Sequence, residues 1–198
     1  MKKSLEKEIL KIKEKIDKLL KEKNRPIVVG IAGGSGSGKG YITDFFLKNI
    51  KGNSISMDDY YIGSENMKDR NFDRPEAIDL ELLKKHIKFF KSKKEVEKPV
   101  YDFVTHKRRG YESYRSDSNV IIIEGLFALN KILIKEIDLK IFIDSPEKSR
   151  LSRRIKRDKE KRKRSKERTI QDWQKIVEPM YKKYAEKQKK YADIILKN

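Results

Sequence analysis

Apolar and polar residues along the chain alternate between short β-branched runs and longer amphipathic stretches. The runs with the length and composition of strands are residues 27–32, 54–57, 119–125, 139–145 and 193–196. Between them, apolar side chains recur at helical spacing in residues 41–47, 79–91 and 169–191. Strands that alternate with helices are typical of a mainly parallel sheet covered on both faces. The pattern therefore predicts a three-layer α/β/α fold around a five-stranded sheet.

A separate amphipathic pattern covers residues 1–24. Its apolar positions, spaced alternately by four and three residues, are Leu5, Ile9, Ile12, Ile16 and Leu19. This spacing predicts a helix with a heptad seam, but fewer than three heptads rarely hold a coiled coil on their own. The helix must therefore pack on its own domain, residues 25–198, or on a partner chain. Both interpretations stay open, and we expect a homo-oligomer.

Residues 96–103 alternate only in part and contain Pro99. Proline cannot donate a ladder hydrogen bond, which confines it to edge strands and similar positions. We therefore expect an edge strand or a hairpin here rather than another central strand. His86, inside the predicted helix 79–91, is interpreted as a helix-face residue rather than a catalyst.

The composition suits one folded domain that does not enter a membrane. At 198 residues the chain is long enough for a full core, with 36% hydrophobic and 41% charged residues. No apolar run approaches the roughly 18 residues that a membrane span needs. The absence of cysteine excludes disulfides, thiol catalysis and zinc–thiolate sites, and it fits a cytoplasmic enzyme.

The formal net charge of +19 points to anionic ligands. Such a charge suits nucleic acid, and it equally suits a protein whose ligands are polyphosphates. The interleaved aromatic and basic residues of RNA-binding sheets are missing, because most Tyr and Phe residues occupy periodic or motif positions. We therefore expect polyphosphate ligands and no nucleic-acid partner.

A glycine-rich segment separates the strand at 27–32 from the helix at 41–47. It fits the pattern Gly-x-x-x-x-Gly-Lys with Gly33, Gly34, Ser35, Gly36, Ser37, Gly38 and Lys39. Glycines let backbone N–H groups surround phosphate oxygens, the helix N-terminus adds partial positive charge, and Lys39 adds a full one. A flexible turn is the alternative. The strand before, the helix after and the lysine in register favour an NTP-binding loop.

Gly40 follows this lysine, where the motif normally carries Ser or Thr. That hydroxyl ligates the Mg²⁺ that holds the β- and γ-phosphates. Gly40 is still counted with the nucleotide-binding residues, because the backbone continues the loop. We expect weaker magnesium binding and slower turnover than a hydroxyl residue would give.

Two carboxylates follow predicted strands. Asp58 comes after residues 54–57, and Glu124 lies near the end of the run 119–125. Ligands of open α/β sheets bind outside the carboxyl ends of the strands. Glu124 is therefore expected to face Mg²⁺, directly or through water, and a strand-ending charge in solvent is the alternative.

Together these motifs resemble the uridine kinase (uridine–cytidine kinase) family, a branch of the P-loop kinases close to phosphoribulokinase. The segments that carry the resemblance are residues 30–39, 57–61, 71–75, 99–103, 105–106, 123–125, 151–154 and 190–195. The ordered set is specific, whereas the phosphate loop alone is shared by many NTPases. The resemblance implies a P-loop NTPase fold of the NMP-kinase-like type. It also implies a small β-hairpin over the acceptor site and an Arg-rich helical lid at about residues 146–168.

The same resemblance implies transfer of the γ-phosphoryl group of ATP or GTP, with Mg²⁺, to the 5′-hydroxyl of uridine or cytidine in pyrimidine salvage. Lys39 and Asp58 are the implied catalytic residues, with Asp58 orienting and deprotonating that hydroxyl. The implied nucleoside contacts are Asp73 and Arg154 at the ribose, Tyr101 and His106 at the base, and Tyr61 and Phe103 as pocket walls. Arg157 and Arg162 match lid arginines that neutralise phosphate charge.

Two further departures from the family lie in or near the lid. Asp172 stands where Gln is usual, which is expected to alter lid contacts or nucleoside preference, and Lys163 replaces a usual Gly, which should stiffen a hinge. Two other functions stay open. A kinase of the same fold could phosphorylate another small hydroxyl compound. Alternatively, the missing hydroxyl at position 40 and the high charge could mark a nucleotide- or nucleic-acid-binding protein with weakened catalysis.

Overall fold

The computed structural model describes residues 3–67 and 69–198, with side chains of the first helix described from residue 6 onward. Its α-helices are α1 (Lys3–Lys23), α2 (Lys39–Asn49), α3 (Leu80–Lys91), α4 (Glu147–Arg162), α5 (Lys166–Asp172) and α6 (Glu178–Met180). Its strands are β1 (Ile27–Gly33), β2 (Asn53–Ser56), β3 (Val96–Asp102), β4 (Lys107–Tyr114), β5 (Val120–Gly125), β6 (Leu139–Asp144) and β7 (Ile194–Lys197).

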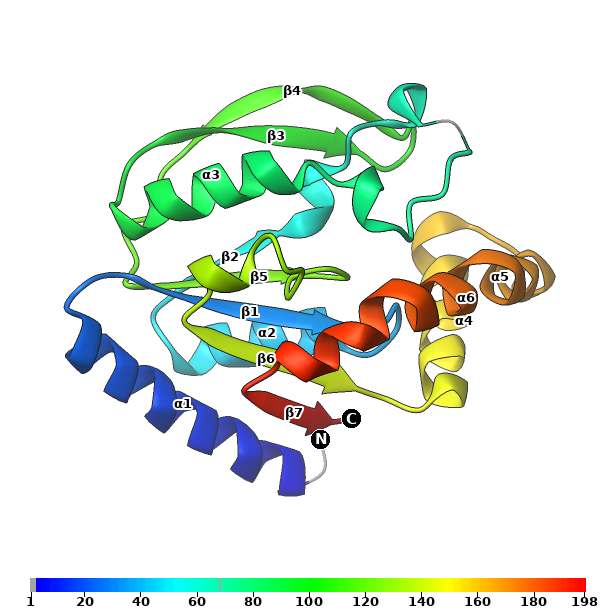
Figure 1. Ribbon diagram of the computed structural model, residues 1–198. Helices are drawn as coiled ribbons and strands as arrows, with labels where there is room; N and C mark the ends of the chain where they lie inside the picture. The colour runs from blue at the N-terminus through cyan, green and yellow to red at the C-terminus, as the bar shows by residue number, and fades with distance from the viewer. Residues whose placement is uncertain (1–2, 68) are drawn as a thin grey trace.

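A five-stranded parallel sheet forms the centre of the molecule, with the strand order β2-β5-β1-β6-β7 (Figure 1). The prediction of a five-stranded parallel sheet is confirmed. Glu124 of β5 is paired in register with Ile31 of β1 and with Ser56 of β2. This register brings the carboxyl ends of three strands to one edge, where the loops after them meet.

The sheet is buried on both faces because its strands alternate their apolar side chains between two layers. Ile27, Val29 and Ile31 of β1 contribute to a cluster with α1 and α2, and Val28 and Ala32 contribute to a cluster with α3. All of these side chains have 0% exposure. Figure 1 shows α1 and α2 on one side of the sheet and α3 on the other. The result is the expected three-layer α/β/α arrangement.

The helix predicted for residues 1–24 is present as α1 and packs against its own chain. Ile9, Ile12 and Ile16 are at most 2% exposed and join the cluster that covers β1, β5 and β6. The side chain of Leu5 lies outside the described residues. No described helix is both long and apolar enough to cross a membrane.

Strands β3 and β4 form the predicted hairpin, an antiparallel pair separate from the main sheet. Pro99 lies in β3 opposite Tyr111 of β4. The hairpin has no third strand, so the missing N–H of Pro99 costs no ladder bond within a larger sheet. In Figure 1 the hairpin lies beyond α3, near the loop that follows β2.

The prediction of one amphipathic helix over residues 169–191 is wrong in two respects: the helical segment begins earlier, and it is not a regular α-helix. The helical segment begins at Lys166, and π-helical turns at Trp173–Val177 and Tyr181–Ala185 flank α6, which contains Pro179. Proline has no N–H for the i→i−4 bond, and a wider turn accommodates that loss. The chain then tightens into a 3₁₀ helix, Glu186–Tyr191, before β7.

Candidate active site

The phosphate loop joins β1 to α2 at the carboxyl edge of the sheet. Gly36 has φ 74° and Gly38 has φ 96°, in the left-handed region that favours glycine. A Cβ at position 36 would also lie 2.2 Å from the carbonyl oxygen of Arg150. Lys39 Nζ donates hydrogen bonds to the carbonyl oxygens of Gly33 (2.9 Å) and Gly34 (3.2 Å). Desolvation lowers the pKa of Lys39, while the charges of Glu124 and Asp58 oppose that change.

Gly40 lies in the first turn of α2 and is exposed. No heavy atom lies within 4 Å of the position that a Cβ would occupy there. Ser or Thr would therefore fit at position 40 without displacing a neighbour.

Arginines of α4 support the phosphate loop from outside. Arg154 donates a hydrogen bond to the Ser35 hydroxyl (2.8 Å), and Arg153 donates to the carbonyl oxygens of Gly36 (3.3 Å) and Ser37 (3.4 Å). The predicted ribose contact Arg154 is thus placed beside the phosphate loop. The loop conformation depends on this helix as well as on its own glycines.

Asp58 lies just after β2, in a 3₁₀ helix, Met57–Tyr60. The strand predicted for residues 54–57 therefore ends one residue earlier, at Ser56. The Ser56 hydroxyl accepts a hydrogen bond from the Asp58 backbone N–H (3.2 Å) and donates one to Glu124 (3.4 Å). Burial and the neighbouring charge of Glu124 together raise the pKa of Asp58 to about 6, against the opposing charge of Lys39. Two carboxylates and one lysine therefore interact at the sheet edge.

The half-buried Glu124 fits the magnesium role that the sequence predicts. Its carboxylate lies beside Ser56 and close enough to Lys39 and Asp58 to affect their pKa values. Within residues 3–67 and 69–198, no group of three or more His, Cys, Asp or Glu side chains could hold a metal ion. Mg²⁺ is usually held by one or two carboxylates together with water and substrate phosphates. The single carboxylate of Glu124 matches this way of holding Mg²⁺, in which the protein supplies few of the ligands.

Asp73 lies in the segment between β2 and α3. Burial raises its pKa, while the charges of Arg154, Arg157 and Arg162 lower it. The predicted ribose acceptor therefore shares its surroundings with the predicted phosphate-binding arginines.

A cluster of aromatic side chains joins the loop after β2 to the hairpin. Tyr61 lies 5.2 Å from Tyr101 and 5.4 Å from Phe72, as measured between ring centroids. Phe72 stacks on His106 at 5.0 Å, and Phe103 contacts Tyr101 edge-on at 5.2 Å. All four predicted pocket residues are brought together. Phe72, for which the sequence predicts no role, completes the cluster.

Arg108 of β4 links the hairpin to the segment that carries Asp58. Its guanidinium donates to the carbonyl oxygens of Tyr60 (3.0 Å) and Tyr61 (2.8 Å). Lys98 of β3 adds a second link, since its Nζ lies 2.8 Å from Asp59 and 2.9 Å from Glu112. The hairpin cannot move far without moving the residues that follow Asp58.

Three features that the sequence pointed to have mainly structural contacts: His86, the Arg-rich run and Asp172. His86 is buried in α3, and its Nδ1 lies 3.0 Å from the Tyr60 hydroxyl, as expected for a helix-face residue. The Arg-rich run predicted over about residues 146–168 forms α4, which ends at Arg162, and the first residues of α5, with Lys163 at φ 51° between them. Asp172 forms ion pairs with Arg164 (3.0 Å) and Arg168 (3.3 Å).

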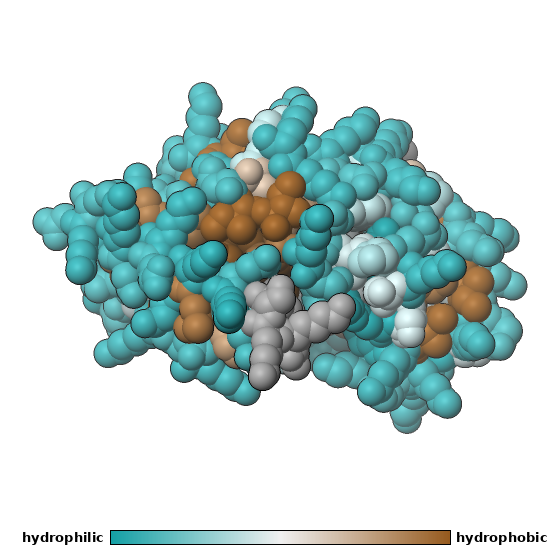
Figure 2. Space-filling model, turned by 90° about the horizontal axis from the view of Figure 1, so that it is seen from below, coloured by the Kyte–Doolittle hydropathy of each residue, from teal (hydrophilic) through white to brown (hydrophobic). Residues whose placement is uncertain are grey.

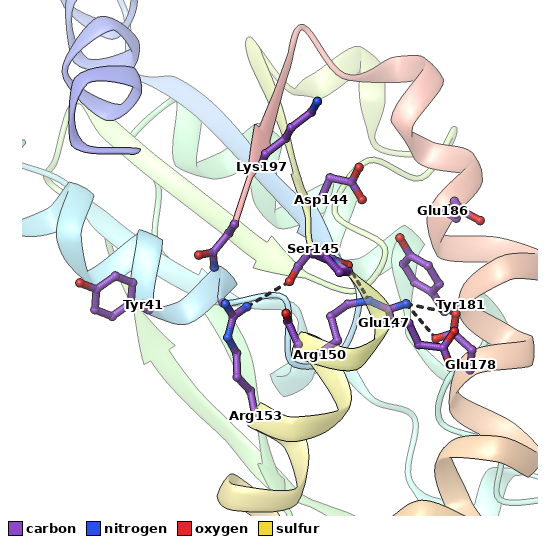
Figure 3. Close-up of a pocket in the computed structure, with 14 residues that line it drawn as sticks. Tyr41, Asp144, Ser145, Glu147, Arg150, Arg153, Glu178, Tyr181, Glu186 and Lys197 are labelled. Carbon is purple, nitrogen blue, oxygen red and sulfur yellow. Dashed lines mark hydrogen bonds and ion pairs between the residues drawn. The ribbon is translucent and has the colours of Figure 1, made fainter. Parts of the chain in front are cut away.

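A cavity of about 1220 Å³ opens beside the end of the phosphate loop (Figure 3). Gly38, Tyr41, Arg153 and Asn198 are among its lining residues. Figure 3 shows Arg150 pointing across it toward Glu178, to which the guanidinium donates at 2.9 and 3.1 Å. The cavity is large enough for a heterocyclic base next to phosphates held by the loop.

A phosphate loop at the carboxyl edge of a parallel sheet, with an arginine-rich helix on one side and a hairpin on the other, defines a P-loop kinase fold. The chain belongs to the Phosphoribulokinase / Uridine kinase family, whose sequence pattern matches residues 28–198.

Individual proteins are similar to this chain in sequence or in fold. The uridine kinase of Ligilactobacillus salivarius is 38% identical over 148 residues, which cover 70% of this chain and 70% of the relative. The structure of a possible uridine kinase from Bacillus stearothermophilus has a TM-score of 0.64 and 21% identity, with 94% and 99% of the chains covered. A D-glycerate 3-kinase from Cryptococcus neoformans shares the fold with a TM-score of 0.59 and 19% identity, covering 79% and 78% of the chains.

Proposed function

We propose that this protein transfers the γ-phosphoryl group of ATP or GTP to the 5′-hydroxyl of uridine or cytidine. One observation carries the proposal. Asp58 lies at the sheet edge, close enough to Lys39 of the phosphate loop and to Tyr61 of the aromatic cluster for its charge to act on both. The family membership and the name of the Ligilactobacillus relative support a pyrimidine nucleoside as acceptor.

In this proposal the acceptor nucleoside lies between the aromatic side chains, which suit a flat heterocycle. Asp73 and Arg154 bind the ribose, and this fixes the 5′-hydroxyl next to Asp58. Asp58 accepts a hydrogen bond from the hydroxyl and takes its proton as the phosphoryl group is transferred. The loose transition state asks little of a base, so orientation of the hydroxyl is its main contribution.

The donor nucleotide binds with its phosphates on the loop and its base in the cavity lined by Tyr41, Arg153 and Asn198. Lys39, Arg157 and Arg162 neutralise the charge that moves between the phosphates. Glu124 would hold Mg²⁺, directly or through water, and the bound ion supplies charge neutralisation at the β- and γ-phosphates.

Two further expectations from the sequence stay predictions: a cytoplasmic location in pyrimidine salvage, and assembly into a homo-oligomer. We also propose that residues 25–198 form the kinase domain and that residues 1–24 are an added helix. The main alternative is another small hydroxyl acceptor, because the D-glycerate 3-kinase has the same fold.

A nucleoside panel with ATP and Mg²⁺, scored for monophosphate product, tests the proposal. We expect product from uridine and cytidine, and none from D-glycerate. Asp58→Asn should remove product formation but retain ATP binding in calorimetry, because the phosphate loop is unchanged. Phosphorylation of D-glycerate or another non-nucleoside in preference to uridine would overturn the proposal.

A further inference from the structure

Asp158 is a fully buried carboxylate (0% exposed) on α4, inside the arginine-rich run. Its Oδ1 accepts hydrogen bonds from Nε (3.0 Å) and a terminal nitrogen (2.8 Å) of Arg157. Arg162 lies 3.7 Å from the same oxygen, and Arg154 Nε lies 3.4 Å from Oδ2. One side chain thus contacts three guanidinium groups.

Helix geometry accounts for this cluster. Arg154 and Arg162 lie four residues before and after Asp158, so both project from the same face of α4 as the carboxylate. A buried carboxylate is costly unless it is paired with charge and hydrogen-bonded. The arginines offset that cost, and in return the carboxylate reduces their mutual repulsion.

The same arginines reach from Asp158 to the candidate site. Arg154 also donates to the Ser35 hydroxyl of the phosphate loop (2.8 Å). The charges of Arg154, Arg157 and Arg162 all act on Asp73, the proposed ribose acceptor. The three arginines therefore contact Asp158 and also act on residues of the candidate site.

The backbone of Asp158 adds a second restraint. Its carbonyl oxygen accepts hydrogen bonds from the N–H groups of Lys163, at the end of α4, and Arg164 (3.1 Å). This turn directs Arg164 to its ion pair with Asp172. Asp158 thus fixes both the arginines of α4 and the turn that follows them.

We propose that Asp158 is a positioning residue for phosphoryl transfer, which holds Arg154, Arg157 and Arg162 in the arrangement that meets the ribose and the phosphates. The inference rests on the proposed function, because it assigns these arginines to the reacting groups. Asp158 itself does not touch substrate in this proposal. The carboxylate has no exposed surface, so it acts only through the arginines.

The isosteric variant Asp158→Asn tests this role, with Asp138→Asn as the matched control. Asp138 is another buried carboxylate, paired with Arg25 (2.8 Å) and Lys23 (3.3 Å) near the amino end of β1, away from the phosphate loop. We expect Asp158→Asn to lower kcat by roughly 10- to 100-fold, as misplaced groups do, with less than about threefold change in KM for ATP. Asp138→Asn should lower thermal stability and leave kcat unchanged.

Chemical rescue distinguishes positioning from stability. Asp158→Ala leaves space beside the arginines, so added formate should restore part of kcat, whereas neutral formamide should not. If Asp158→Asn keeps wild-type kcat while the wild type makes uridine monophosphate, the inference is wrong and the proposed function stands. If Asp158→Asn does not fold, absence of formate rescue in a folded Asp158→Ala overturns the inference. If the wild type phosphorylates no nucleoside, the proposed function fails and this role fails with it.

Discussion

Asp58 illustrates how a single residue acquires its chemistry from its neighbours. Burial and the nearby charge of Glu124 raise its pKa to about 6, although Lys39 opposes the change. The proposed role needs the ionised carboxylate, so the active fraction falls as the pH falls through the pKa. The raised value therefore brings the loss of activity close to neutral pH.

We predict that kcat/KM for uridine falls tenfold for each unit of pH below about 6, with a plateau above about 7, because kcat/KM reports the groups of the enzyme before uridine binds. A profile of kcat/KM for uridine against pH checks this. Thermal melting at each pH serves as the control for loss of fold. A profile that stays flat down to pH ~4.5 would show that Asp58 is not the group that limits the reaction.

Gly40 gives a second prediction about a single residue. Gly40→Thr and Gly40→Ser should lower the Mg²⁺ concentration for half-maximal activity and raise kcat, because either residue returns a hydroxyl near the metal. Because no heavy atom lies within 4 Å of a Cβ at position 40, neither substitution requires neighbouring residues to move. Stability should be equal or up to about 1 kcal/mol higher, since glycine is unfavourable inside a helix.

Gly40→Ala is the matched control for this experiment, because it adds the Cβ without the hydroxyl. It should reproduce any gain in stability and leave the magnesium dependence unchanged. An unchanged magnesium dependence in both hydroxyl variants would mean that position 40 is not at the metal.

The positions of individual residues were predictable where they are tied to the ends of strands. Lys39 and Asp58 follow strands of the parallel sheet and Glu124 lies at the carboxyl end of β5, so their meeting at one edge follows from the fold. Phe72 and Asp158 could not be assigned in this way. Phe72 acts through stacking on the distant His106, and only the fold brings them together. Asp158 did leave a signal, as an acid spaced four residues from arginines on both sides.

Among the elements, α4 ends at a strained residue. Lys163 ends the helix with φ 51°, a conformation that favours glycine over lysine. We predict that Lys163→Gly raises the free energy of unfolding by about 0.5–1 kcal/mol, because relief of strain exceeds the added freedom of the unfolded chain.

Lys161→Gly is the control for this change, because Lys161 lies in the last turn of α4 with ordinary helical geometry. It should lower the free energy of unfolding by about 1 kcal/mol. Urea denaturation of both variants measures the difference. Two changes of the same sign would contradict the assignment of strain to position 163.

The long helical segment after α4 shows where the sequence pattern was insufficient. Apolar periodicity predicted one regular helix, whereas Pro179 is accompanied by π-helical turns on both sides. Tertiary packing stabilises these turns. Trp173 and Tyr181 are both buried, and the Arg150 guanidinium lies over both rings, 5.1 and 4.0 Å from their centroids. Periodicity within one segment carries no information about that contact.

On the scale of the whole molecule, α1 extends the core on one face of the sheet. Its apolar stripe is buried in the chain itself, and its outer face is charged. Figure 2 views the molecule from the side on which α1 lies and shows a mostly hydrophilic surface with limited apolar patches. Leu10 of α1 is among the exposed hydrophobic residues, with 52% exposure. The buried residues of α1 therefore contribute to folding of this chain, whereas an exposed residue such as Leu10 could contribute only to contacts with another chain.

We predict that Ile16→Ala lowers the free energy of unfolding by about 2–4 kcal/mol, because a fully buried side chain (0% exposed) is replaced by a cavity. Leu10→Ala, the exposed control on the same helix, should change it by less than about 0.5 kcal/mol. Urea denaturation at several protein concentrations measures both.

If α1 packs only on its own domain, the loss in Ile16→Ala is the same at every concentration. If α1 also joins subunits, the midpoint of unfolding of the wild type rises with concentration, and Leu10→Ala abolishes that rise. A concentration-dependent midpoint that neither variant alters would place the subunit interface elsewhere than α1.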